Sequence, residues 1–138
     1  KLEGWYKYKA GANFSSKGEI IEGRKDKCDI YGVLYETDDN VQFLDGSTSL
    51  TSPNIVALAR NLDALPETDN WKQFSFKFEP KNGKSIDSDK LEKGIYKLAI
   101  VFSSSVDGGK FEGAVGSTLY IDKVVIEHTS NPNEYPAN

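Results

Sequence analysis

The residues of this 138-residue chain best suited to chemistry are aromatic rings that alternate with polar or charged side chains. Sugars present C–H-rich faces that pack on aromatic rings, and their hydroxyl rims take hydrogen bonds from charged and amide side chains. The sequence therefore predicts a saccharide site. Its expected stacking residues are Trp5, Tyr31 and Tyr35, and its expected polar contacts are Lys7, Asp29 and Arg60. The alternative is that these rings pack against a covering loop or a neighbouring domain.

The composition offers few residues for a metal site or for nucleophilic catalysis. The chain has one histidine, His128, and one cysteine, Cys28, whereas a zinc site needs several such ligands. No base lies near the serine run 103–105, so His128 is assigned a structural or surface role and Cys28 a place in the core. No cofactor is expected, apart from a structural calcium ion for which Asp107, Asp122 and the cluster 38–40 are candidates.

Charge and hydropathy exclude two further classes of function. The net charge is −4 and the pI about 5.0, so the basic excess of a nucleic-acid-binding protein is missing. No run of 18 apolar residues exists, and no membrane span is expected.

Glycoside hydrolysis would need two carboxylates that face one groove, roughly 5–9.5 Å apart. Asp29 and Glu36 fall on opposite faces of the segment 28–36, and most other acids fall in loops. A catalytic pair from loops remains an open alternative, but no motif selects one. The chain is therefore read as a binding domain rather than an enzyme.

Alternating segments must position these residues. Residues 2–9 place Leu2, Tyr6 and Tyr8 on one face and Trp5 with Lys7 on the other. Segment 28–36 is apolar on both faces, which is typical of a strand covered on both sides or lining a groove. Further strands are expected at 55–61, 71–79, 94–103 and 117–128. Their expected inward residues are Phe74, Phe76, Phe78, Tyr96, Leu98, Ile100 and Phe102.

Recurrent strands with almost no helix predict an all-β fold. We expect a two-sheet antiparallel sandwich with jelly-roll topology and about eight strands. The expected domain covers residues 1–129, and residues 130–138 form a polar tail.

Two stretches carry a family resemblance: the opening LEGWYKY at 2–8 and the stretch from SSS at 103–105 to GAVGSTLYID at 113–122. Together they resemble the carboxy-terminal part of the putative carbohydrate metabolism domain family of Bacteroidetes, and the related galactose-binding-like modules. The resemblance implies a jelly roll akin to carbohydrate-binding modules, in an exported periplasmic or cell-surface lipoprotein whose amino-terminal β domain is missing from this chain.

The function implied is a carbohydrate-binding module-like domain in glycan recognition or utilisation. Its partners would be an oligo- or polysaccharide and other domains of the same polypeptide. Members of the family are labelled glycoside hydrolases, but no established catalytic motif defines it, so no catalytic residue carries over. Two alternatives stay open: a glycoside hydrolase that uses loop carboxylates, and a structural or adhesion module that packs on a partner domain.

Overall fold

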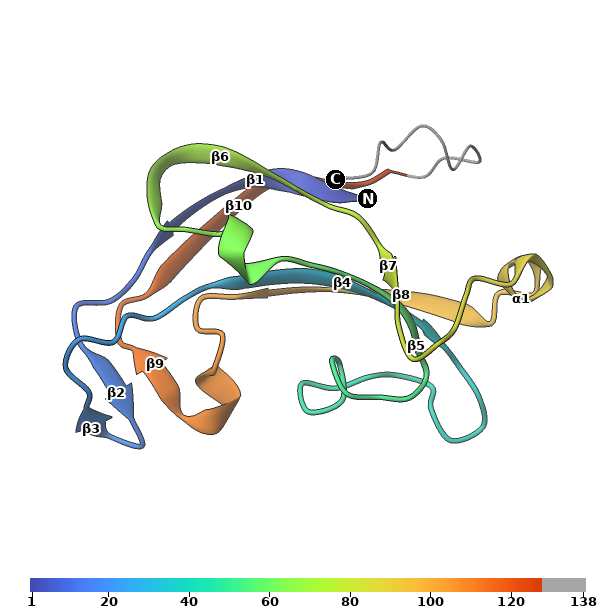
Figure 1. Ribbon diagram of the computed structural model, residues 1–138, viewed down its shortest axis with the longest axis horizontal. Coiled ribbons are helices and arrows are strands. Elements are labelled where there is room, and N and C mark those ends of the chain that lie inside the picture. The colour runs from blue at the N-terminus through green and yellow to red at the C-terminus, as the bar shows by residue number, and fades with distance from the viewer. Residues whose placement is uncertain (128–138) are drawn as a thin grey trace.

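The computed structural model describes residues 1–127, which form ten strands in three small antiparallel sheets (Figure 1). One sheet has the order β10-β1-β6, from strands Thr118–Ile126, Leu2–Lys9 and Thr68–Phe76. A second has the order β7-β5-β4-β8, from Glu79–Pro80, Ile55–Arg60, Asp29–Glu36 and Tyr96–Ser103. The third has the order β3-β2-β9, from Glu19–Ile20, Phe14–Ser16 and Glu112–Ala114. The chain is thus all-β, with ten strands where about eight were expected.

Helical structure in the described chain is limited to short segments: α1 (Ser88–Glu92) and the 3₁₀ turns η1 (Leu62–Ala64) and η2 (Gly108–Lys110). None of the helices is long and apolar enough to cross a membrane. His128 and the expected polar tail 130–138 lie outside the described residues.

The two larger sheets lie one above the other and share the main core. Alternation explains which residues enter it, because successive side chains of a strand point to opposite faces. The residues predicted to point inward from β1 and β6 are buried there together with residues from β4, β5 and the loops. This core contains Leu2, Tyr6, Tyr8, Cys28, Ile30, Ala59, Leu65, Phe74 and Phe76.

Strand β4 is buried on both faces, as its sequence predicted. Ile30 enters the main core, while Tyr31, Val33 and Tyr35 form a second cluster on the opposite face. The segment 37–54 covers this cluster with Leu44 and Leu50. The prediction of a strand at 55–61 is confirmed by β5, whose Ile55 joins the same cluster.

The prediction that the alternate apolar residues of β8 are buried in the core is wrong. Leu98, Ile100 and Phe102 share a face with Ile30 of β4, yet they remain between 36% and 42% exposed. Tyr96 is half-buried, and its hydroxyl accepts a hydrogen bond from the Asp87 backbone at 3.0 Å. β8 is the last strand of its sheet, and within residues 1–127 the face that carries these three residues is only partly covered.

Candidate functional site

The outer face of the β10-β1-β6 sheet carries a group of exposed aromatic rings. Trp5 on β1 is 38% exposed, Trp71 on β6 is 44% exposed and Tyr120 on β10 is 54% exposed. Lys7 lies among them, with its Nζ 4.9 Å from the centroid of the Trp71 ring and 5.0 Å from that of Tyr120. We call Trp5, Lys7, Trp71 and Tyr120 the platform.

Strand register explains why these side chains meet. The residue opposite Lys7 on β10 is Tyr120, and Trp5 lies between Asp122 of β10 and Gln73 of β6. Because directly paired residues project from the same face, all of these side chains point outward together. Three adjacent strands span about 10 Å, which is wider than one sugar ring.

The Lys7 ammonium lies over two rings. Such cation–π contacts contribute about 0.5–1 kcal/mol each at exposed sites. They hold the aliphatic part of Lys7 between the rings while the ammonium keeps donors for a ligand. The platform therefore combines apolar faces with a fixed hydrogen-bond donor.

A shallow hollow of about 210 Å³ adjoins the platform at the end of the sheet. Lys7 and Tyr120 line it together with Asp69 and Thr118. Within residues 1–127 the Asp69 carboxylate makes no hydrogen bond or ion pair, so both of its oxygens are open to a ligand hydroxyl. Hydroxyl recognition next to ring stacking is the combination that a sugar site requires.

The other predicted site residues lie on a different sheet. Asp29, Tyr31 and Tyr35 project from the outer face of β4 and are each at most 5% exposed. Arg60 of β5 donates to both oxygens of Asp29, at 3.1 and 2.6 Å, and its guanidinium lies 5.6 Å from the Tyr31 ring centroid. The structure thus places Trp5 and Lys7 at one site and these four residues at another.

The outer face of β4 is partly accessible through a groove of about 650 Å³ between the segment 37–54 and the loop after β8. Asp29 and Tyr31 line this groove, whereas Tyr35 does not. The Tyr31 hydroxyl is 2.7 Å from Ser49 Oγ of the covering segment, so its polar end is already bonded. Asp29, Arg60 and Tyr31 mainly hold one another and the cover in place.

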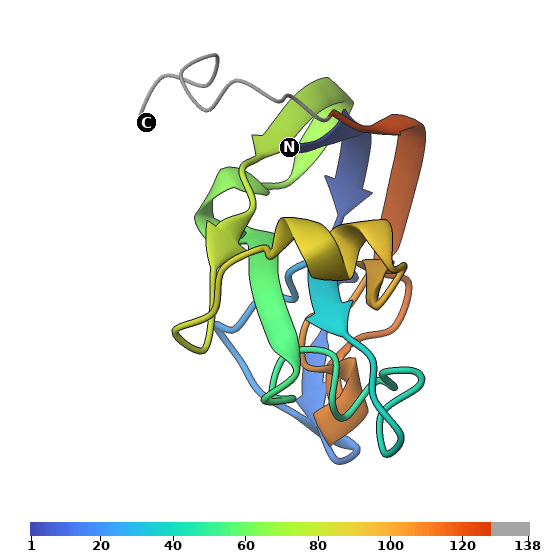
Figure 2. The same ribbon diagram turned by 90° about the vertical axis from the view of Figure 1, so that its right-hand side faces the viewer.

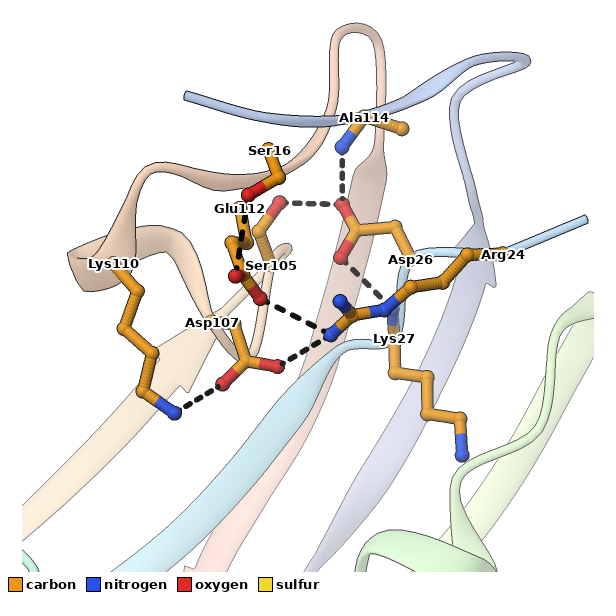
Figure 3. A network of polar contacts seen from close by, with 9 residues as sticks. All are labelled: Ser16, Arg24, Asp26, Lys27, Ser105, Asp107, Lys110, Glu112 and Ala114. Atoms are coloured by element: carbon orange, nitrogen blue, oxygen red, sulfur yellow. Dashed lines mark hydrogen bonds and ion pairs between the residues drawn. The ribbon is translucent and has the colours of Figure 1, made fainter. Parts of the chain in front are cut away.

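A third polar cluster lies at the β2–β9 end of the molecule (Figure 3). Asp26 is buried, and its Oδ2 accepts hydrogen bonds from Ser105 Oγ at 2.6 Å and Ala114 N at 2.9 Å. The same oxygen also accepts from Ser117 Oγ at 2.7 Å. Its Oδ1 accepts from Lys27 N at 2.9 Å. A buried carboxylate needs such partners. The cluster therefore fixes the stretch 113–117.

Next to Asp26, the Arg24 guanidinium lies between two further carboxylates. It is 3.4 Å from Asp107 Oδ2 and 3.2 Å from Glu112 Oε2 (Figure 3). Lys110 adds a contact of 3.2 Å to Asp107. Arg24 thus bridges Asp107 and Glu112 through two ion pairs.

The calcium candidates are largely engaged within the protein. Asp38 accepts from Asn54 Nδ2, and this bond is the main reason why its pKa lies below the usual value. Asp122 accepts from Lys123 N, and Asp107 binds Arg24. Within residues 1–127 no three His, Cys, Asp or Glu side chains converge as metal ligands.

The sequence predictions missed Trp71, Tyr120 and Asp26. The signal for Trp71 was present, since it has the opposite parity to the inward residue Phe74. Tyr120 likewise alternates with Leu119 and Ile121, which pack against the core. Asp26 had no such signal, because its partners come from residues about 80 to 90 positions away.

Residues 1–127 match the model of a family described as putative carbohydrate metabolism domain. A crystal structure of a putative glycoside hydrolase from Bacteroides thetaiotaomicron is 48% identical, with a TM-score of 0.89 over 94% of this chain and 38% of that one. A second one, from Bacteroides vulgatus, is 44% identical, with a TM-score of 0.80 over 89% of this chain and 49% of that one. This chain thus spans less than half the length of either. The comparison with curated proteins gave no match.

Proposed function

Because the chain belongs to the putative carbohydrate metabolism domain family, we propose that it is a noncatalytic carbohydrate-binding domain whose platform binds an oligo- or polysaccharide. Trp5, Trp71 and Tyr120 stack on sugar faces, and Lys7 and Asp69 bond to hydroxyls. The proposal includes jelly-roll topology for a domain of residues 1–129. It also includes a place beside other domains in an exported bacterial protein, in the periplasm or as a cell-surface lipoprotein.

The observation that carries the proposal is the exposure of three large rings on one sheet face around one lysine. Contiguous exposed apolar surface on a soluble domain marks a binding surface. Rings interleaved with Lys7, Gln73 and Asp122 favour a ligand that is both apolar and hydroxylated over a purely apolar one.

The test is retention of the protein on a panel of immobilised polysaccharides and on a glycan array. The double variant Trp5→Ala with Trp71→Ala should lose retention on every glycan that the unmodified protein binds. The matched control is Phe43→Ala, because Phe43 is 77% exposed and lies under Lys97, away from the platform. Equal retention of the double variant and the control would refute the platform assignment. No retention of the unmodified protein on any glycan would favour packing of the rings on a partner domain.

The second candidate is a glycoside hydrolase, which the printed names of both solved relatives favour. Asp107 and Glu112 are the candidate acids, because both form an ion pair with Arg24. Release of reducing ends from a bound polysaccharide, abolished by Glu112→Gln, would support this function. We expect no such release, because Arg24 engages both acids in ion pairs.

A further inference from the structure

On one side of the molecule, the edge strands β8 and β10 of the two larger sheets carry inward-facing apolar side chains that remain exposed. In the lower sheet, Ile30 of β4 is fully buried, but its partner Phe102 on β8 is 41% exposed. In the upper sheet, Leu2 of β1 is fully buried, but its partner Ile126 on β10 is 41% exposed. At each of these two pairs the burial of the side chain therefore falls steeply within one strand spacing of about 4.8 Å.

The opposite side of the molecule is closed. There the chain passes from β6 in the upper sheet through β7 to the lower sheet, whereas β10 forms the other side (Figure 2). Phe74 and Phe76 of β6 are buried although β6 is also the last strand of its sheet. Edge position alone thus does not explain the exposure on the β8 and β10 side.

Strand β8 is well suited to accept another strand. Within residues 1–127 it pairs with β4 alone, so the backbone groups along its other edge are unpaired. Its run from Leu98 to Phe102 is wholly apolar and lacks the inward charges or proline that usually protect an edge. The edge of β10, in contrast, is interrupted at Lys123, which has a φ of 52°.

We propose that an extended segment of the same polypeptide, outside residues 1–138, pairs with β8 and buries Leu98, Ile100 and Phe102. The segment is a strand with apolar residues at alternate positions, since an inserted strand must fill the space between the sheets with one face. Both solved relatives have chain available for it, because this chain covers 38% of one and 49% of the other. A tethered segment also has a high effective concentration at the edge, which a second copy of the chain does not. The inference is independent of the sugar-binding proposal.

The test uses the complete gene product with Ile100→Lys and the matched control Val125→Lys. In residues 1–127 both positions are exposed, Ile100 at 36% and Val125 at 52%, but Val125 points to the outer face of its sheet, beside Glu3. If a strand covers β8, Ile100→Lys should lower the melting temperature by about 10 °C and Val125→Lys by about 2 °C. Equal small decreases in the melting temperature of the two variants would overturn the proposal.

Hydrogen exchange on the unmodified gene product provides a second measurement that needs no variant. The β8 amides that do not donate to β4 should exchange at least about 100-fold more slowly than free amides. Exchange at the free rate would overturn the proposal. So would a dimer that Ile100→Lys converts to monomer in light scattering, because the occupant would then be a second copy.

Discussion

The outer faces of β1 and β4 carry similar residues, but the face of β1 is exposed to solvent and the face of β4 is buried. On β1, Trp5 and Lys7 stay open to solvent and join Trp71 and Tyr120. On β4, Tyr31 and Tyr35 lie beneath the segment 37–54. Alternation thus determines which face of the sheet a side chain takes, whereas a loop from elsewhere in the chain determines whether that face is open to a ligand.

The cover over β4 is itself well anchored. Lys81 Nζ donates to the Leu50 carbonyl at 2.6 Å, and Asn82 Nδ2 donates to the Ser52 carbonyl at 3.1 Å. Asp45 closes a turn in the segment, and its bonds to Ser47 are the main reason why its pKa lies below the usual value. We therefore assign the outer face of β4 to stability, and the binding that we propose to the outer face of β1.

The largest expected effect is on stability and comes from the β4 face. Arg60→Ala leaves the Asp29 carboxylate, which is 4% exposed, buried without its partner. This should lower the free energy of unfolding by about 3–5 kcal/mol, measured by urea denaturation. The control Lys25→Ala breaks an exposed ion pair with Glu67 and should cost at most about 1 kcal/mol. Equal losses in the two variants would contradict the assignment.

The next largest effect should be a loss of folding stability at alkaline pH, through the tyrosines on the buried face of β1. Burial raises the pKa of Tyr6 and of Tyr8 from 10.0 to about 12, and that of Cys28 from 9.0 to about 12. Because the unfolded chain loses these protons first, the resulting stability is present below about pH 9 and is lost between pH 9 and 12. Urea midpoints from pH 8 to pH 11 should fall, and fall less in Tyr8→Phe. A flat profile would contradict the burial of these groups.

Trp71→Ala should separate binding from stability on the platform. Truncation of a stacking ring should cost about 2 kcal/mol of binding free energy, a rise of about 30-fold in Kd by calorimetry with a retained glycan. Because Trp71 is 44% exposed and its main packing partner is the Lys7 ammonium, the free energy of unfolding should fall by no more than about 1 kcal/mol. An unchanged Kd would remove Trp71 from the site.

Tyr31→Phe should give the smallest effect. It deletes the hydroxyl that is 2.7 Å from Ser49 Oγ and should lower the free energy of unfolding by about 1 kcal/mol. The Kd for the glycan should not change. A weaker affinity in this variant would show that the groove beside β4 takes part in binding, and the contrast between the two faces would fail.

Much of the fold followed from the sequence because local alternation reports burial directly. It predicted the buried faces of β1 and β6 and the double burial of β4. It could not predict that segment 37–54 would cover Tyr31 and Tyr35, because the cover depends on contacts between residues far apart in the chain. It also placed Phe102 and Ile100 in the core, since the pattern of a strand does not reveal whether its sheet continues beyond it.

The most direct measurement uses the two tryptophans of the sequence, Trp5 and Trp71, which both lie on the platform. Their indole N–H groups give two resolved signals in a ¹⁵N-correlated NMR spectrum, so a glycan identified on the array can be followed at the site itself. We predict that both signals shift as glycan is added and that their titration curves give the same Kd as calorimetry. A glycan that binds while both indole signals stay unmoved would contradict this prediction.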